Sequence, residues 1–164
     1  MEEKDKKIAK NTEKSDQNEQ NYDKSADFLI ELYKNVQMGK LAFEYLLPKT
    51  KDGELKEELL NQYNDFETLT AKISGAIIEL GKTPNSSLGI AKPMLKHSIN
   101  VTMAFNSSTQ KIADMLTQGD NQGIMDINRL LNSTKDKVSN KALSLAHELL
   151  EIEQRHIDKL KKWL

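Results

Sequence analysis

Apolar residues recur every three or four positions along most of this chain, which is the spacing of an amphipathic α-helix. The most regular stretch lies between Asp52 and Gly81, and its apolar side chains are Leu55, Leu59, Tyr63, Phe66, Ile73, Ile77 and Leu80. Gly81 is the residue type that commonly follows the last turn of a helix. No stretch of the sequence alternates between apolar and polar positions as a half-buried strand does, so the pattern predicts an all-α protein.

The same spacing predicts a long helix at each end of the folded part of the chain. The first begins at Ser25, a favoured N-cap residue, and ends at Pro48, which cannot continue it. In this helix Gly39 occupies one position of the otherwise apolar row. The last helix follows a loop over residues 132–139 and continues to Leu164.

A third long helix is predicted from Ile90 or Pro93 to Gln118, with more polar residues on its inward row. We expect Gly119 and Asp120 to break it, and a short extra helix to cover about residues 121–131. The fold expected from these elements is an antiparallel four-helix bundle with one extra short helix between the third and last long helices. The side chains expected to be largely buried in its core are Phe43, Tyr63, Phe66, Ile73, Phe105, Leu150 and Ile157.

The first 20 residues differ in composition from the rest of the chain. After Met1 they contain only two apolar side chains, Ile8 and Ala9. Such a segment cannot bury enough apolar surface to offset the entropy lost on ordering. We therefore expect a disordered polar tail over residues 1–20 and a single helical domain over residues 21–164.

Composition excludes several classes of function. Lys and Arg number 24 against 25 Asp and Glu, and they are interspersed, so we expect no nucleic-acid partner. The absence of cysteine excludes disulfides, thiolate catalysis and Cys-ligated metal sites. No apolar run approaches the about 18 residues of a membrane span, and the N-terminus has no hydrophobic signal segment, so we expect a cytoplasmic protein without a membrane partner.

The strongest chemical signal lies in the last predicted helix. Its apolar face is marked by Ala146, Leu150, Ile157, Leu160 and Leu164. Glu153 occupies an inward position in this row, and His156 lies three residues later on the same side. A Glu-x-x-His pair that faces the interior of a helical bundle is a recurrent way to bind a metal. The pair also fits a buried hydrogen-bonded contact that fixes helix register, or a solvated helix edge.

Over about Ser25 to Leu164 the order and pattern of the predicted helices resemble the ferritin-like superfamily of four-helix bundles. Residues 34–84, in which Asp52 opens a D-x-x-L-K pattern, are similar to the first helix pair of small bacterial ferritin-like proteins of unknown function. Residues 112–132 and 142–164 are similar to the C-terminal half of an uncharacterised Firmicutes-type group of the same kind, and this second similarity is the closer one.

The resemblance implies a di-metal centre with one Glu on each of two helices and a Glu-x-x-His on each of the other two. The candidate ligands in this sequence are Glu44, Glu67, Glu153 and His156, with Asp65 and His97 as weaker candidates. The motif is incomplete, because the second predicted helix has no Glu-x-x-His and the third has no Glu. Carboxylate and imidazole ligands suit iron, manganese or zinc. Glu44 and Glu67 also fit residues at the edge of a bundle, near Lys40 and Lys72.

Two functions remain open from the sequence. One is a ferritin-like protein that binds a divalent metal at a degenerate site inside the bundle. The alternative is a metal-free structural or stress-associated bundle that acts through oligomerisation or partner binding. No combination of nucleophile, base and orienting residue can be assembled, which favours a protein that is not an enzyme. We also expect a homo-oligomer, with a dimer favoured.

Overall fold

The computed structural model describes residues 2–85, 87–134 and 137–164, with side chains from Lys24 onward, and all regular structure in this part is helical. The elements are α1 (Glu2–Leu46), α2 (Gly53–Glu79), α3 (Ala91–Phe105), α4 (Thr109–Thr134) and α5 (Asn140–Leu160), with short 3-10 segments at Leu47–Lys49 and Lys161–Trp163. The prediction of an all-α protein is confirmed.

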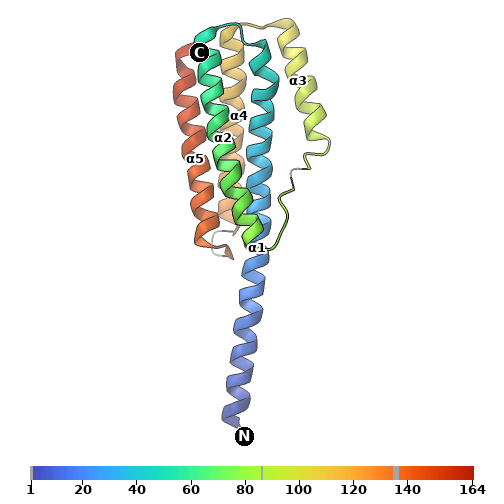
Figure 1. Cartoon of the computed structure of the whole chain (residues 1–164), viewed down its shortest axis with the longest axis vertical. Coiled ribbons are helices and arrows are strands. Elements are labelled where there is room, and N and C mark those ends of the chain that lie inside the picture. Colours follow the sequence, from blue (N-terminus) through green and yellow to red (C-terminus); the bar gives the residue numbers. More distant parts are fainter. Residues whose placement is uncertain (1, 86, 135–136) are drawn as a thin grey trace.

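Four helices, α1, α2, α4 and α5, lie side by side, and α3 lies outside them against α1 (Figure 1). Helix α1 packs on α2 and α4, and α5 packs on the same two helices. Helices α1 and α5 run in one direction and α2 and α4 in the other (Figure 1). The connection from α2 to α4 runs the length of this group by way of α3, and buried apolar side chains from all four helices form one core.

The starts of α2 and α5 follow from their N-cap side chains. Asp52 Oδ1 accepts a hydrogen bond from the backbone N–H of Leu55 at 2.8 Å. Ser139 Oγ accepts one from the N–H of Ala142 at 3.2 Å. Each bond satisfies one of the amide groups that the first turn leaves without a helical partner. The predicted bounds of the second helix and the predicted loop before the last helix are therefore confirmed to within a few residues.

Helix α1 continues through Ser25, so the predicted helix start at this residue is wrong. Ser25 is buried, and its Oγ accepts a hydrogen bond from the N–H of Ser139 at 2.9 Å. The hydroxyl thus connects α1 to the residue that caps α5 instead of capping its own helix. The side chains of residues 1–20 lie outside the described part of the chain. The predicted disorder of this segment therefore stays a prediction.

The predicted break at Gly119 and Asp120 is wrong, and so is the separate short helix over residues 121–131, because α4 passes through all of them without interruption. The third predicted helix is interrupted instead between α3 and α4. There Asn106 Oδ1 accepts a hydrogen bond from the N–H of Ser108 at 3.0 Å, and Ser108 Oγ accepts one from the N–H of Lys111 at 3.2 Å. These side chains compete with helical hydrogen bonds and start a new helix.

The early break changes which residues of this region reach the core. Phe43, Phe66, Ile73 and Ile157 are buried as predicted, and Tyr63 and Leu150 are partly buried. Phe105 is 89% exposed, so the prediction of its burial is wrong. The row that α3 turns toward α1 consists of Leu95, Ile99 and Met103, and Phe105 lies outside it.

Candidate functional site

Glu153 and His156 both point into the protein, as the sequence predicts. The exposed fraction is 3% for Glu153 and 0% for His156. The two side chains face different helices, however: Glu153 lies against α4, and His156 meets Asp65 on α2. They therefore form two separate polar contacts in the core.

His156 forms the contact with α2. Its Nε2 lies 3.2 Å from Oδ2 of Asp65, and Nη2 of Arg155 donates to the same oxygen at 2.9 Å. Partial burial works to raise the pKa of Asp65, but the hydrogen bonds from Arg155 and His156 outweigh it and lower that pKa. Asp65 is therefore a carboxylate that can only accept, so Nε2 of His156 carries the proton and donates it.

The surroundings of His156 keep its ring neutral. Burial lowers the pKa of His156 to about 4, although Asp65 opposes this shift. The ring packs edge-on against Phe66 and Phe43, with centroid distances of 5.0 and 6.2 Å. Nδ1 of His156 has no hydrogen-bond partner among the described residues. A neutral, aromatic-packed ring with one hydrogen bond to Asp65 is a structural contact between α5 and α2.

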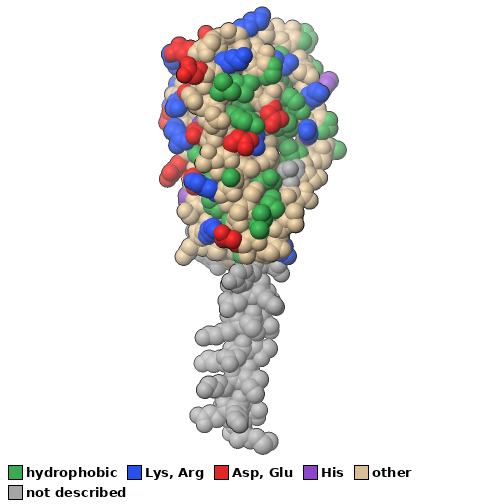
Figure 2. Space-filling model, in the orientation of Figure 1, with side chains coloured by type: hydrophobic (Ala, Val, Ile, Leu, Met, Phe, Trp, Pro, Cys, Tyr) green, Lys and Arg blue, Asp and Glu red, His purple; other side chains and the backbone are tan. Residues whose placement is uncertain are grey.

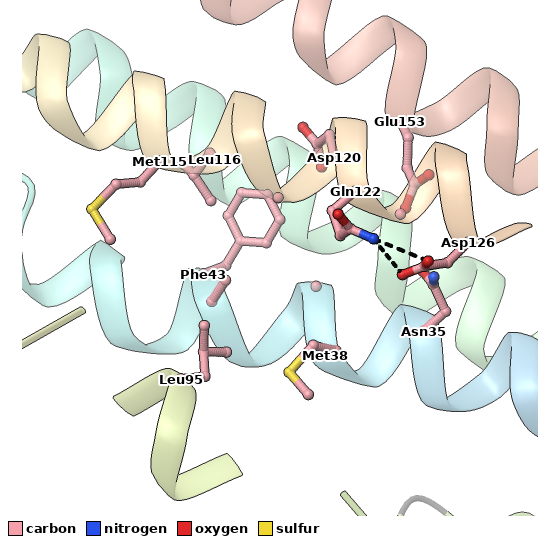
Figure 3. Close-up of a pocket in the computed structure, with 14 residues that line it drawn as sticks. Asn35, Met38, Phe43, Leu95, Met115, Leu116, Asp120, Gln122, Asp126 and Glu153 are labelled. Atoms are coloured by element: carbon pink, nitrogen blue, oxygen red, sulfur yellow. Dashed lines mark hydrogen bonds between the residues drawn. The ribbon is translucent and has the colours of Figure 1, made fainter. Parts of the chain in front are cut away.

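Glu153 forms the contact with α4, where Gly123 makes room for its carboxyl group. A Cβ atom added to Gly123 would lie 2.8 Å from Cδ of Glu153 and would overlap its Oε1. Asp120 lies about one turn before Gly123, and its exposed fraction is 6%. Figure 3 shows Asp120 reaching from α4 toward α5 and Glu153 reaching from α5 toward α4.

Neither of these two acids is fully paired. Oδ2 of Asp120 and Oε2 of Glu153 are buried without a hydrogen-bond partner among the described residues. Burial, together with the negative charges of Asp120 and Asp126, raises the pKa of Glu153 to about 9. Burial also raises the pKa of Asp120 well above its usual range. Glu153 therefore favours the protonated form at neutral pH unless a positive charge joins it, and burial shifts Asp120 in the same direction.

A cavity of about 260 Å³, partly open to the surface, lies beside the two acids (Figure 3). Its described lining contains no Lys, Arg or His. The apolar part of this lining comes from Met38, Ala42, Phe43, Leu95, Met115 and Leu116. The polar part comes from Asn35, Asp120, Gln122, Asp126 and Glu153. A more open groove along α1 and α4 shares Asn35, Met38 and Asp126 with the cavity, which gives a route from the surface.

The structure does not bring the other predicted ligands to Glu153 or His156. Glu44 is exposed on α1, and Glu67 forms an ion pair with Lys40. The hydrogen bond from Lys40 lowers the pKa of Glu67. His97 is exposed on α3.

Asp65 is thus the one predicted candidate that meets His156. Among the described residues, no group of three or more His, Cys, Asp or Glu side chains is arranged to hold a metal ion. These residues do not fit the di-metal centre that the ferritin-like resemblance implies.

Asp120 is the site residue that sequence reasoning missed, although the sequence holds a signal for it. The buried residues of α4 recur every three or four positions, and they are Ile112, Leu116, Asp120, Gly123, Ile127 and Leu131, with Ala113 beside the first. Asp120 occupies an inward position in this row, as Glu153 does in α5. This periodicity is hard to recognise in the sequence, because Gly119 and Asp120 are residue types that favour turns.

Comparison of the chain with known protein families, curated proteins and solved structures found no match. The resemblance to the ferritin-like superfamily therefore stays a prediction.

Proposed function

We propose that this protein is a non-enzymatic binding protein that holds a small organic cation in the cavity beside Asp120 and Glu153. The observation that carries the proposal is the pair of carboxyl groups, each with an unpartnered buried oxygen, in a cavity whose described lining lacks a basic side chain. A buried carboxyl group without partners destabilises a fold, and a buried carboxylate does so more strongly. A bound ammonium group would supply both the missing charge and the missing hydrogen-bond donors.

The rest of the cavity favours a ligand with an apolar body. The part of the ligand away from its charge would contact apolar side chains, which are Met38, Phe43, Met115 and Leu116. Methionine side chains adapt to ligands of different shape. A volume of about 260 Å³ suits a molecule smaller than the drug-sized ligands of typical pockets. The ligand class is therefore a short alkyl or aryl ammonium ion.

The proposed architecture is the ferritin-like four-helix bundle that the sequence resembles. Two features support it: neighbouring long helices run antiparallel, and one long crossover that contains α3 connects α2 to α4. A single long crossover is the connection typical of ferritin-like folds. In such a bundle Glu153 would occupy the position of an inward carboxylate ligand of a metal site. Asp120 and the cavity beside it would make this position bind an organic cation instead of a metal ion.

A divalent metal ion is the second candidate for the same cavity. Asp120 and Glu153 offer carboxylate oxygens, and Asn35 and Gln122 on its lining offer amide oxygens. Such ligands suit hard cations, which would complete their coordination with water. Iron, manganese or zinc would then bind here and not at Glu44 and Glu67.

Thermal unfolding with matched additives tests the proposal. We expect hexylammonium to raise the melting temperature, because it binds the folded state alone, while hexanol and hexanoate of equal length leave it unchanged. Glu153→Gln should abolish the rise, whereas Glu151→Gln, on the exposed face of α5, should keep it. A rise with manganese but not with hexylammonium would favour the metal ion. A melting temperature that responds to neither would refute both candidates.

A further inference from the structure

The two buried acids that line the cavity offer two separate oxygens to a ligand. Oδ2 of Asp120 and Oε2 of Glu153 lack a hydrogen-bond partner among the described residues. Asp120 belongs to α4 and Glu153 to α5, so the two oxygens come from different helices. An unpaired buried polar atom costs free energy until a partner reaches it. A ligand that satisfies both oxygens as a donor therefore needs at least two N–H or O–H groups.

Asp126, the third acid of the cavity lining, already has its partners. Nε2 of Gln122 donates to both of its oxygens at 3.0 Å, and Nη1 of Arg129 donates to its Oδ1 at 2.8 Å. Figure 3 shows the two bonds from Gln122. Among the described residues of the lining, only Asp120 and Glu153 have a buried side-chain oxygen without a partner. These two acids are therefore the groups that a ligand has to satisfy.

The lining does not suit a cation that lacks N–H groups. Quaternary ammonium ions are typically bound by cages of aromatic rings, whose faces attract the charge. Phe43 is the one aromatic residue of the described lining, and it packs edge-on with Phe66 and His156. Lys and Arg side chains lie on the outer surface, as Figure 2 shows for one face, and the described lining contains none. A cation in this cavity therefore depends on hydrogen bonds to the two acids.

The route to the acids begins at the surface of the protein. Asn35, Met38 and Asp126 line both the cavity and the more open groove, so the mouth of the cavity lies between α1 and α4. No helix in the described part of the chain is long and apolar enough to cross a membrane. An amine in solution enters the cavity between α1 and α4.

We propose that Asp120 makes the cavity selective for ammonium ions that carry at least two N–H groups. Primary and secondary ammonium ions can donate to Asp120 and Glu153 at once, whereas a tertiary ion reaches one of them and a quaternary ion neither. A site that is built to hydrogen-bond its ligand rejects analogues without the donor, because its own buried groups are then left unpaired. The inference rests on the proposed function and narrows its ligand class. Glu153 supplies the charge, and Asp120 is the specificity-determining residue.

Calorimetry with a series of hexylammonium ions that carry none, one, two or three methyl groups on the nitrogen tests the proposal. Each ion has one positive charge at neutral pH, and each methyl group replaces one N–H. We expect hexylammonium and its N-methyl form to bind with similar affinity. The N,N-dimethyl form should bind about tenfold more weakly, since one buried oxygen is left without a donor, and the trimethyl form should bind more weakly still.

A matched ligand separates the loss of N–H groups from the added size. It is the isomer of the N,N-dimethyl form in which both methyl groups are moved from the nitrogen to the adjacent carbon. This isomer has the same charge and bulk but keeps three N–H groups. We expect it to bind about tenfold more tightly than the N,N-dimethyl form.

A variant of Asp120 connects the selectivity to this residue. Asp120→Ala removes one of the two acceptors, so the N,N-dimethyl form should then bind as tightly as the N-methyl form. Asp114→Ala is the control on the same helix and should keep the tenfold difference, because Asp114 pairs with Lys111 and does not line the cavity. Melting temperatures without ligand show whether each variant is folded, and the wild-type series tests the proposal without any variant.

The possible failures of the inference and of the proposed function are distinguishable. Equal affinity of the wild-type protein for all four ions would overturn the inference and leave the proposed function standing. Equally weak binding of the two isomers would do the same, because size would then decide the affinity. A tenfold difference that persists in a folded Asp120→Ala would also overturn it. No binding of any of these ions would refute the proposed function and the inference together.

Discussion

At the scale of single residues, the protonation of Glu153 makes stability depend on pH. Glu153 holds its proton up to about pH 9 in the folded protein, against an ordinary pKa of 4.5. Between these values the unfolded chain binds fewer protons, so stability should fall as pH rises from about 5 to 9. We expect the melting temperature of the wild-type protein to fall over this range and that of Glu153→Gln to fall less. Identical slopes for the two proteins would show that Glu153 is already ionised in the folded state.

His156 should respond in the opposite direction. Its pKa lies at about 4 in the folded protein, against an ordinary 6.5, so the unfolded chain binds more protons between these values. The stability that the neutral ring contributes is therefore lost as pH falls from about 6.5 toward 4. Nuclear magnetic resonance should show the ring signals of His156 unchanged between about pH 8 and 5. A titration midpoint near 6.5 would mean that the ring is not enclosed by Phe43 and Phe66.

At the scale of the elements, the contact between α4 and α5 depends on the missing side chain of Gly123. Gly123→Ala should be less stable than Gly119→Ala by about 1–3 kcal/mol, because the added methyl group would overlap the carboxyl group of Glu153, which must move to make room. Gly119→Ala is the matched control on the same helix, since nothing lies within 4 Å of its added Cβ. That variant should be more stable by about 0.5–1 kcal/mol, because alanine favours the helix.

Urea unfolding of both variants measures the two changes in free energy. If Gly123→Ala is as stable as Gly119→Ala, Glu153 does not rest against the backbone of α4, and the geometry assigned to the acid pair is wrong.

The helices differ in how well the sequence predicts them. The second and last helices were predictable, because their apolar rows are regular and Gly81 and the loop before Ser139 mark their ends. The α3–α4 region was mispredicted, because Gly119 and Asp120 have residue types that favour turns. In the structure Asp120 instead faces α5, and the break lies at Asn106 and Ser108, where local side-chain hydrogen bonds replace the helical ones.

The candidate site was predictable only in part. The apolar row of α5 was sufficient to place Glu153 and His156 inside the protein. Their partners depend on the rotation of α2 and α4 about their axes, which a single sequence does not determine. His156 therefore meets Asp65, a weaker candidate, and Glu153 lies near Asp120, whose negative charge helps to raise the pKa of Glu153.

At the scale of the whole molecule, one aromatic cluster connects three of the four packed helices. Phe66 on α2 meets the rings of Phe43 on α1 and His156 on α5, and its ring lies where a Cβ on Gly39 would be. Phe66→Ala should therefore cost about 3–5 kcal/mol of stability. Phe105→Ala, which truncates an 89% exposed ring, should change it by less than about 0.5 kcal/mol. Equal losses in chemical unfolding would contradict this arrangement of the core.

The account of the molecule as a binding protein depends on its cavity, and proton release on binding tests it most directly. Isothermal titration calorimetry with hexylammonium at about pH 7, in two buffers of different ionisation enthalpy, measures the affinity and the protons exchanged together. Because Glu153 must ionise to pair with the cation, we expect release of about one proton per ligand bound. Binding without proton release, or equal binding by Glu153→Gln, would contradict the account, as would the absence of binding.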